Sequence, residues 1–439
     1  MRPGDLGYDP IRPCLVLSHA LHARNWIASG MLRKMSDAGL FGTVLMPAAL
    51  AVEYGQQVPF GWDLKPLEPW IAGRWKTRAL EALRLGMLVA GARRGGLNYR
   101  MKVKAKRRPL PAAEMLAWRI LSKVTDPLPV VRGLGRAIPA PRTLFPAGCT
   151  RLVLPTMIHD DALQAGIVRA ARRARVPVLA IPAGFDNFVT KGAFLDQPDR
   201  IAVWGRASAF QAEDQGFAPG QITITGPPHF WPYSLLARVP RLAMPQSRHV
   251  VFAGTTVNYA ADELLILRSL GDALAAKPDT RDIAILYRPH PRRNLSGPQI
   301  DALKGHHVVM DPKWGGGWTS SPTLIPWIRT ITEGALCTIS AFSTVVLESA
   351  LVGTPSILIG FGDSAHGSGR AIDHADFEHM AEIARAPGIF TVHSIDELVS
   401  QIRLLGLLPK LPTREWALEI ADVDLDPRDR LIDWIKETA

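Results

Sequence analysis

The chain is poor in cysteine and has no long apolar run. Its three cysteines, Cys14, Cys149 and Cys337, lie far apart in apolar, strand-like surroundings, so we expect buried free thiols in a reducing compartment and no disulfide framework. No apolar run reaches the ~18 residues that a membrane-spanning helix requires, and the start of the chain lacks the long apolar stretch of a secretory signal. These absences predict a cytoplasmic globular protein.

Length and charge suggest more than one domain. At 439 residues the chain exceeds what one hydrophobic core usually organises, so two domains of roughly 200 residues are expected. The net charge of +11 is uneven, because residues 1–140 hold 22 Lys and Arg against 9 Asp and Glu. The basic excess therefore belongs to the N-terminal third.

The first half of the chain has an α/β rhythm that an insertion interrupts. Short apolar strands are predicted at Cys14–Ser18 and Gly42–Met46, with a helix at 26–38 between them. Prolines, tryptophans and basic residues break the rhythm from about residue 60 to 145, and it returns at Arg151–Pro155. We therefore predict a Rossmann-like domain at residues 1–235 that carries a basic insertion.

A second series of strands and helices follows a proline-rich stretch at 230–248. Its strands are predicted from Arg248–Phe252 to Ser356–Ile359, with helices between them, which indicates a parallel sheet in residues 249–410. Residues 411–439 form a tail that is predicted to end in a helix at 428–437. The predicted fold class is thus α/β, with two Rossmann-like domains facing a cleft.

Hydroxyl side chains cluster where one predicted strand of the second half turns into a helix. Ser340, Ser343 and Thr344 lie there, so their hydroxyls and the free amides of the first helical turn are suited to receive a phosphate. The plainer interpretation is that Ser343 is an N-cap, worth roughly 1 kcal/mol. Glu348 favours the ligand interpretation, because it lies one turn further along the helix, where it can accept hydrogen bonds from two ribose hydroxyls.

Basic side chains follow another predicted strand of the same half. Arg288, His290 and Arg292 alternate with prolines that keep the backbone extended. A guanidinium holds phosphate with two hydrogen bonds, and an imidazole donates a proton or hydrogen bond to a leaving diphosphate. The alternative is a proline-stiffened loop with solvated charges. A third loop suited to a pyrophosphate consists of Gly254, Thr255 and Thr256.

These motifs carry a resemblance to a known family. The pattern Arg-Pro-His-Pro followed by Ser-x-x-Ser-Thr-x-x-x-Glu-x-x-x-x-Gly-x-Pro is similar to the C-terminal half of GT-B glycosyltransferases. It resembles most the capsule polysaccharide synthesis group and its relatives that make teichoic acid, polysialic acid and Kdo linkages, many of which use cytidine nucleotides. The resemblance implies donor binding by His290, Ser343 and Thr344, and more loosely by Arg288, Ser340 and Glu348.

The same resemblance places the acceptor and a catalytic base in the N-terminal domain. Residues 184–192, 198–205 and 224–228 are similar to the second half of that domain. An imidazole or a partly desolvated carboxylate would serve as the base, and the sequence leaves open which one. For each histidine the alternative is a hydrogen-bonded structural ring, and for Asp186 it is a turn cap shared with Asn187. The candidates are His19, His22, Asp160, Asp161, Asp186 and Lys191.

We expect neither a metal nor a cofactor beyond the nucleotide-sugar substrate. The Asp-x-Asp cluster of metal-dependent transferases is missing from every predicted strand end, and Asp422–Asp426 lies in the tail. Cations and helix termini would then assist departure of the nucleotide.

A basic segment in the insertion suggests a further partner. Residues Arg93–Arg108 contain eight Lys and Arg and no acid, and such a cluster can hold a protein at an anionic membrane. A solvated loop is the competing interpretation. Nucleic acid is not expected, because Tyr99 is the only aromatic residue of the run and no recognised binding motif accompanies it.

The sequence therefore predicts a metal-independent glycosyltransferase that moves a sugar from a nucleotide donor to a capsule or cell-envelope glycan, free or lipid-linked, at the inner face of the plasma membrane. One alternative keeps the site and changes the reaction to nucleotide-sugar epimerisation or glycerol-phosphate transfer. The other is a non-catalytic protein that binds membranes or polyanions on the same scaffold.

Overall fold

A computed structural model of the chain shows two compact units. It describes residues 11–68, 128–136, 145–158, 162–239, 248–255, 263–314, 320–341, 343–361, 378–408 and 410–437, with single positions between 79 and 126. The first domain comprises Met1–His229 with Leu425–Ala439, and the second comprises Phe230–Asp424. The predicted domains ended at 235 and 410 and left 411–439 as a tail. In the structure this tail is divided between the two domains, because helix 414–420 packs against helix 345–351 of the second domain while helix 427–437 joins the apolar core of the first.

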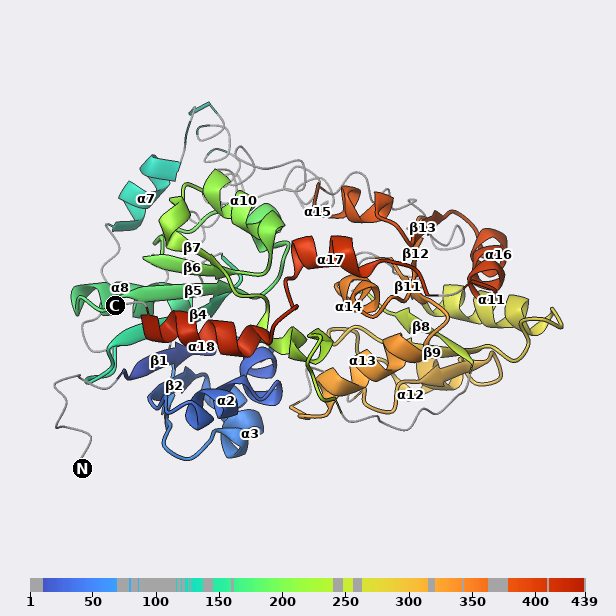
Figure 1. Ribbon diagram of the computed structural model, residues 1–439, viewed down its shortest axis with the longest axis horizontal. Helices are drawn as coiled ribbons and strands as arrows, with labels where there is room; N and C mark the ends of the chain where they lie inside the picture. Colours follow the sequence, from blue (N-terminus) through green and yellow to red (C-terminus); the bar gives the residue numbers. More distant parts are fainter. Residues whose placement is uncertain are drawn as a thin grey trace. The chain divides into compact units, whose positions relative to one another are not determined.

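The first domain is built on a sheet of seven parallel strands in the order β3-β2-β1-β4-β5-β6-β7 (Figure 1). Its strands are β1 (Pro13–Val16), β2 (Thr43–Met46), β3 (Asp63–Pro66), β4 (Arg151–Thr156), β5 (Val178–Pro182), β6 (Arg200–Val203) and β7 (Ile222–Ile224). Its helices include α1 (Ala20–Ala23), η1 (Arg24–Ala28), α2 (Met31–Asp37), α3 (Ala48–Tyr54), η2 (Gly55–Gln57), α7 (Leu128–Arg136), α8 (Ala162–Arg173), α9 (Asn187–Thr190), α10 (Arg206–Asp214), η4 (Pro219–Gln221) and α18 (Pro427–Glu437).

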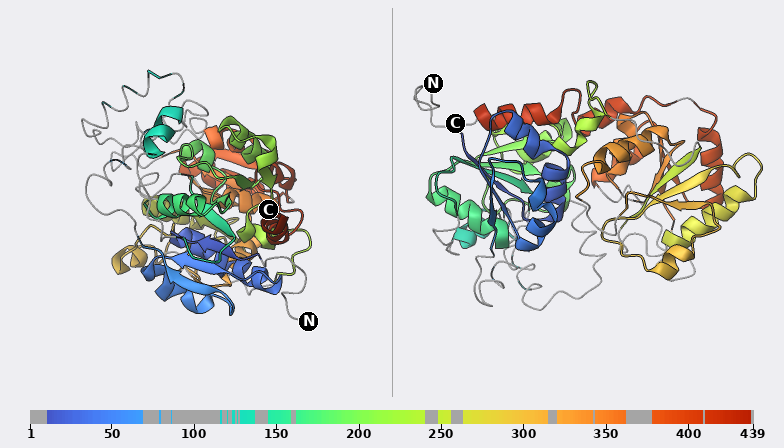
Figure 2. Two further views of the ribbon diagram at one scale, coloured as in Figure 1. Left: turned by 90° about the vertical axis from the view of Figure 1, so that its left-hand side faces the viewer. Right: turned by 90° about the horizontal axis from the view of Figure 1, so that it is seen from below.

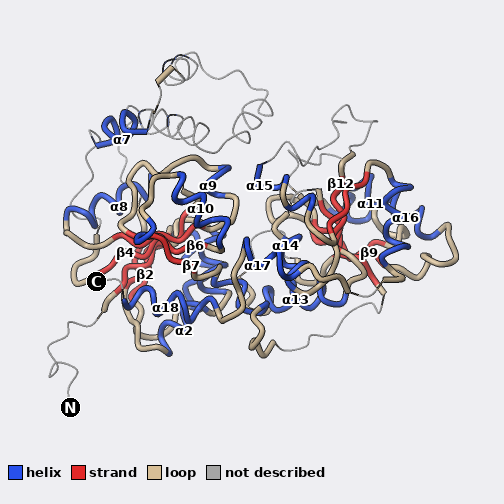
Figure 3. The backbone as a smooth tube through the Cα atoms, turned by 45° about the horizontal axis from the view of Figure 1, so that its top comes forward, coloured by secondary structure: helices blue, strands red, loops and turns tan. Residues whose placement is uncertain are grey.

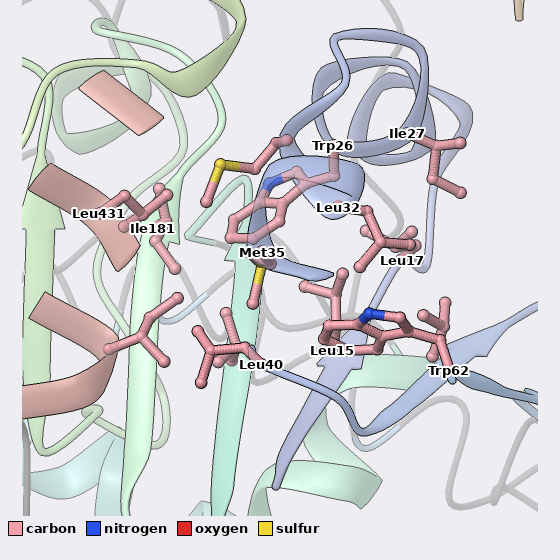
Figure 4. Close-up of a cluster of buried hydrophobic side chains, with 14 of the residues drawn as sticks. Leu15, Leu17, Trp26, Ile27, Leu32, Met35, Leu40, Trp62, Ile181 and Leu431 are labelled. Carbon is pink, nitrogen blue, oxygen red and sulfur yellow. The ribbon is translucent and has the colours of Figure 1, made fainter. Parts of the chain in front are cut away.

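Alternating side chains of this sheet build two apolar layers. Leu15 on β1 faces α2 and α18, where Trp26, Met35 and Leu431 complete a buried cluster (Figure 4). The neighbouring residue Cys14 faces the opposite side, toward α8. Successive side chains of a strand point to opposite faces, so a short apolar strand must be covered on both, and each fully buried aliphatic side chain contributes about 1.5–3 kcal/mol.

The prediction of one continuous helix at 26–38 is wrong. The chain instead makes α1, a π-helical turn η1, and then α2. The backbone N–H of Ser29 donates to the carbonyl of Arg24, and the Ser29 hydroxyl donates to the carbonyl of Asn25. Gly30 follows with a left-handed φ of 77° and starts α2 in a new direction. The apolar pattern predicted a helix correctly but gave no signal of this break.

The second domain is built on six parallel strands in the order β10-β9-β8-β11-β12-β13. The strands are β8 (His249–Ala253), β9 (Ala284–Arg288), β10 (Val308–Met310), β11 (Thr338–Ser340), β12 (Ser356–Ile359) and β13 (Ile389–Val392). The helices include α11 (Glu263–Ala275), α12 (Gly297–Asp301), α13 (Leu324–Gly334), α14 (Val345–Leu351), α15 (Glu378–Ala381), η8 (Ile383–Arg385), α16 (Ile395–Leu405) and α17 (Arg414–Ile420), and η5 (Pro228–Tyr233) lies where the two domains join.

Helices cover both faces of this sheet too (Figures 2 and 3). α11 and α16 pack on one face, where Leu270 and Ile402 belong to the same buried cluster as Phe252. α13 covers the other face with Trp327 and Ile331. No helix in the described ranges has the length and apolar character that crossing a membrane requires.

Strand order locates one point in each sheet where ligands are expected. Connections run outward in one direction from β1 and in the other from β4, and the same reversal occurs between β8 and β11. In open parallel sheets ligands bind outside the carboxyl ends of the strands at such a switch point. The loops that follow β1, β4, β8 and β11 are therefore the first places to look for a site.

Candidate functional site

Three strand ends of the second domain lie side by side at its switch point. Ala253, the last residue of β8, pairs with Ser340, the last residue of β11, on one side and with Arg288, the last residue of β9, on the other. Neighbouring strands are about 4.7–4.9 Å apart, so the loops that follow them are adjacent. The structure thus brings together the three segments that the sequence singled out.

Gly254 lies in the tightest part of this cluster. Its N–H donates to the carbonyl of Arg288 at 2.9 Å. A Cβ atom here would lie 2.5 Å from Oε1 of Glu263 and 3.1 Å from the backbone N of His290. The position therefore requires glycine for close packing of two loops.

A buried carboxylate holds the Gly254 loop from below. Glu263, at the start of α11, is 1% exposed and accepts a hydrogen bond from the N–H of Thr255 at 2.7 Å. Its other contacts are the Tyr287 hydroxyl and Nε of Arg293, the latter at 3.4 Å. Burial raises the pKa of Glu263, while the Arg293 charge and these hydrogen bonds oppose that rise. The Thr255 amide is thereby committed to the protein, and Thr256 lies outside the described residues.

The predicted basic loop separates into side chains with different roles. Arg288 forms an ion pair with Asp311, whose Oδ1 also accepts from the indole of Trp327 at 2.8 Å. Nδ1 of His290 accepts the N–H of Arg292 at 3.0 Å, so a neutral His290 carries its proton on Nε2. The Arg292 side chain is exposed. Arg288 is therefore tied to the fold, while the exposed Arg292 keeps guanidinium donors for a ligand.

The hydroxyl loop after β11 also separates into bonded and unbonded groups. Ser340 is fully buried, and its Oγ has no hydrogen-bond partner within the described part of the chain. Oγ of Ser343 accepts the N–H of Val345 at 3.3 Å. The N-cap of α14 is Thr344, which is exposed and makes no side-chain capping bond. The predicted N-cap at Ser343 is therefore one residue too early, although its hydroxyl does accept an amide of the first helical turn.

Glu348 lies in the first turn of α14 and is 6% exposed. Its Oε1 accepts a hydrogen bond from the Tyr233 hydroxyl at 3.3 Å. Burial, followed by the charge of Glu348, raises the pKa of Tyr233 well above its ordinary value, so the phenol remains a donor at neutral pH. The helix is packed as its apolar sequence predicted, and a protein group occupies one of the oxygens that were assigned to a ribose.

In the first domain, two candidate histidines follow β1. His19 caps α1, and its Nδ1 accepts the N–H of Leu21 at 3.0 Å. His22 is 2% exposed, and its Nδ1 lies 3.4 Å from the Ser18 hydroxyl. The two rings meet edge to face at 6.0 Å between centroids. Both are hydrogen-bonded rings, as the structural alternative predicted.

The carboxylate candidates differ in what is known of them. Oδ2 of Asp186 accepts from the Thr190 hydroxyl at 2.6 Å, and its Oδ1 accepts from the Asn187 amide at 3.1 Å. The side chain therefore stabilises its own turn, as the capping alternative expected. Asp160 and Asp161 lie outside the described residues, as does the basic segment Arg93–Arg108.

A small hollow opens at the carboxyl ends of β4 and β5 in the first domain. It is a shallow space open to solvent, lined by His22, Asn25, Trp26, Trp204 and His229 together with Pro155 of β4 and Pro182 of β5. Burial and the nearby Arg24 charge lower the pKa of His229 well below its ordinary value, so this ring is neutral. Among the described residues that line it, none is acidic.

Sequence reasoning missed the buried groups that support these loops. Glu263 and Asp311 each pair with an arginine more than twenty residues away, and no local pattern reveals such pairs. The available signal was an acid in the first turn of a largely apolar helix. Within the described residues, no group of three or more His, Cys, Asp or Glu side chains is placed to hold a metal ion.

Comparisons with known proteins define the fold. No family model matches the chain, and no curated protein matches it in sequence. Among solved structures, the UDP-GlcNAc 2-epimerase from Neisseria meningitidis bound to UDP-GlcNAc is 9% identical with a TM-score of 0.53, covering 98% of this chain and 99% of that one. The UDP-GlcNAc 2-epimerase from Methanocaldococcus jannaschii is 8% identical with a TM-score of 0.52, covering 97% and 99%. The glycotransferase of kitacinnamycin is 12% identical with a TM-score of 0.52, covering 98% and 99%.

These likenesses confirm the predicted fold class. The chain consists of two Rossmann-like domains of the GT-B type, with parallel sheets of seven and six strands. At identities near a tenth they concern the fold alone, and function rests on the site.

Proposed function

We propose that the chain is an enzyme of nucleotide sugars, and specifically a metal-independent glycosyltransferase whose second domain binds the donor nucleotide. The observation that carries this proposal is the register of Ala253, Arg288 and Ser340, three strand ends side by side at a topological switch point. The loops that follow offer hydroxyls, an imidazole N–H and an exposed guanidinium within reach of one anionic ligand.

Each loop has a role in this proposal. The Nε2–H of His290 and the side chains of Ser340 and Thr344 donate to the donor's phosphates, and Arg292 adds charge. Gly254 lets the chain approach the pyrophosphate closely, because it lacks a Cβ atom. Arg288 acts indirectly by holding the loop through Asp311. Glu348, which accepts from the Tyr233 hydroxyl through Oε1, would also accept from a ribose hydroxyl.

The acceptor is assigned to the first domain. We propose a glycan of the cell envelope, with the base supplied by a loop after β1, β4 or β5. An anionic membrane would be contacted through Arg93–Arg108. Hydrogen-bond donors at developing charge lower the barrier without a metal, so the proposed donor loops are sufficient for departure of the nucleotide.

Epimerisation of the nucleotide sugar is a second candidate. It is favoured by the likeness of the whole chain to 2-epimerases, one of which is described as bound to UDP-GlcNAc. An epimerase needs no acceptor. Incubation with sugar-labelled UDP-GlcNAc, with and without an added envelope fraction, therefore separates the two activities. A 2-epimer that forms without the envelope fraction indicates the epimerase, whereas label that moves only to the added envelope fraction indicates the transferase.

The shared donor site has its own test, with a matched control. His290→Ala is expected to raise the Kd of the bound nucleotide at least tenfold, which corresponds to about 1.4 kcal/mol. His306→Ala is the control, because that ring pairs with Asp272 at 2.6 Å on the surface of the same domain. Equal nucleotide affinity of the two variants, measured by calorimetry, would remove His290 from the site.

A further inference from the structure

A buried chain of polar side chains in the first domain joins α8 to β4 and β1. Oγ1 of Thr156, at the end of β4, accepts the N–H of Ile158 at 3.0 Å. The same hydroxyl lies 3.0 Å from Oε1 of Gln164 on α8. Since an amide oxygen only accepts, Thr156 must donate its proton to Gln164.

The amide of Gln164 has one possible orientation. Its Nε2 lies 2.8 Å from the carbonyl oxygen of Pro155, which accepts and never donates. The nitrogen must therefore occupy this side, and one of its two protons goes to Pro155. The second proton goes to Oγ of Ser18, at 2.9 Å.

The next hydrogen bond takes its direction from the proton of Ser18. Oγ of Ser18 accepts from Gln164, and Nδ1 of His22, at 3.4 Å, is the acceptor that this proton meets among the described residues. Ser18, His22, Gln164 and Thr156 are all at least nine-tenths buried, so water does not scramble the order. With Nδ1 acting as an acceptor, a neutral His22 carries its proton on Nε2.

We propose that Gln164 is a positioning residue that, through Ser18, holds His22 in the Nε2–H tautomer, so that His22 is a hydrogen-bond donor and not the catalytic base. Asn25, which lines the same hollow as His22, also presents a hydrogen-bond donor. Its Oδ1 accepts two N–H groups of Arg24, at 3.0 and 2.8 Å, which leaves its amide nitrogen as the donor. The hollow is thus built to receive an oxygen atom of a substrate, such as a hydroxyl or a carboxylate.

The tautomer of His22 does not depend on the proposed function. Only the role that this tautomer would have in the reaction rests on the proposed function. If the chain is a transferase or an epimerase, the donor on His22 would bind the oxygen of the group that reacts, and the base would come from another loop of this domain. If no nucleotide binds, the proposed function fails, while the prediction about the His22 ring can still be tested.

The test is nitrogen NMR of the full chain labelled with [15N]histidine, at about pH 8, above the ordinary pKa of histidine. His22 is assigned by its loss in His22→Gln. The two-bond couplings of the ring distinguish Nε2–H from Nδ1–H. The wild type is expected to show Nε2–H, and a His22 signal with Nδ1–H, or with both forms equally populated, would overturn the proposal.

A substitution of similar shape at Gln164 is expected to reverse the direction of the hydrogen bond between Ser18 and His22. In Gln164→Glu an oxygen replaces Nε2 and cannot satisfy both Pro155 and Ser18, so Ser18 donates to the carboxyl group and accepts from Nδ1–H of His22. The ring is then expected to switch to Nδ1–H, and catalysis, if present, to fall on the order of a hundredfold in kcat without a change in donor Kd.

Gln197→Glu is the matched control, because Nε2 of Gln197 donates to the carbonyl of Gly216 on the surface of the same domain. Its His22 signal is expected to match that of the wild type. A folded Gln164→Glu variant that keeps Nε2–H, or the same switch in both variants, would overturn the role of Gln164. If Gln164→Glu does not fold, the wild-type spectrum still decides the tautomer.

Discussion

Replacement of Gly254 by alanine tests the packing of the proposed donor loops. The backbone at Gly254 has no left-handed φ, so alanine is not excluded by backbone conformation. The new methyl group would instead lie 2.5 Å from Oε1 of Glu263 and 3.1 Å from the backbone N of His290. Normal carbon–oxygen contacts exceed 3 Å, so Glu263 must move away or the two loops must separate.

The magnitude follows from what holds Glu263 in place. Its carboxylate accepts from the Thr255 amide and the Tyr287 hydroxyl and lies beside Arg293. A displacement weakens these bonds inside the domain, where no water replaces them. Overpacking of this kind costs about 1–3 kcal/mol. The Kd for a nucleotide should also rise, by about tenfold or more, if the loop must open by even 1.4 kcal/mol.

Urea unfolding and nucleotide calorimetry measure the two effects. The matched control is Gly297→Ala in α12, where an added Cβ meets nothing within 4 Å and where alanine should change stability by at most about 1 kcal/mol, in the stabilising direction. If Gly254→Ala unfolds at the same urea concentration as Gly297→Ala and binds nucleotide like the wild type, Gly254 is not closely packed against Glu263 and His290.

Three further predictions concern buried ionisable groups. Asp311→Asn should lower the free energy of unfolding in urea by about 3 kcal/mol, because it leaves the Arg288 guanidinium without its buried partner. The control Asp282→Asn removes an exposed pair and should leave the free energy of unfolding unchanged, so equal effects of the two substitutions would contradict this prediction. Burial raises the pKa of Glu263, so its stabilising contribution is complete below the ordinary value of 4.5 and is lost as pH rises through the folded-state pKa. The stability of wild type relative to Glu263→Gln should therefore decline as pH rises above the ordinary value, and a flat difference would refute the raised pKa. A hydrogen bond from a neighbouring thiol lowers the pKa of Cys149 to about 6, so its alkylation, followed by peptide mass mapping, should rise near that pH while the buried Cys337 does not react; a midpoint near the ordinary value of 9 would contradict it.

The strands of both domains could be predicted because their apolar runs are short and covered on both faces. β12 begins and ends as predicted, at Ser356–Ile359, and β4 extends one residue beyond its prediction. β3, by contrast, is fully exposed along Asp63–Pro66, and only backbone hydrogen bonds to the β2 edge reveal it. β13 was missed as well, and its middle residues, Phe390 and Thr391, are not buried. Burial leaves a pattern in the sequence, whereas pairing at an exposed edge does not.

The sequence predicted which loops come together at the site, but not which hydrogen bonds and ion pairs their side chains form. Strand ends of a parallel sheet share one edge, so the Gly254, Arg288 and Ser340 segments had to converge. The contacts of each side chain depend on partners distant in sequence, and Arg288 illustrates this: it was expected to bind a phosphate, and the structure shows an ion pair with Asp311 that the sequence did not reveal. Glu348 similarly meets Tyr233 across more than a hundred residues.

The central claim is that the loops after β8, β9 and β11 bind the phosphates of a nucleotide, and calorimetry of the full chain tests it most directly. A panel of CMP, CDP, UDP, GDP and ADP would be compared with the corresponding nucleosides. The account predicts that at least one nucleotide binds, and that its nucleoside, which lacks phosphate, binds at least about tenfold more weakly. No binding by any member of the panel, or a nucleoside that binds as tightly as its nucleotide, would contradict it.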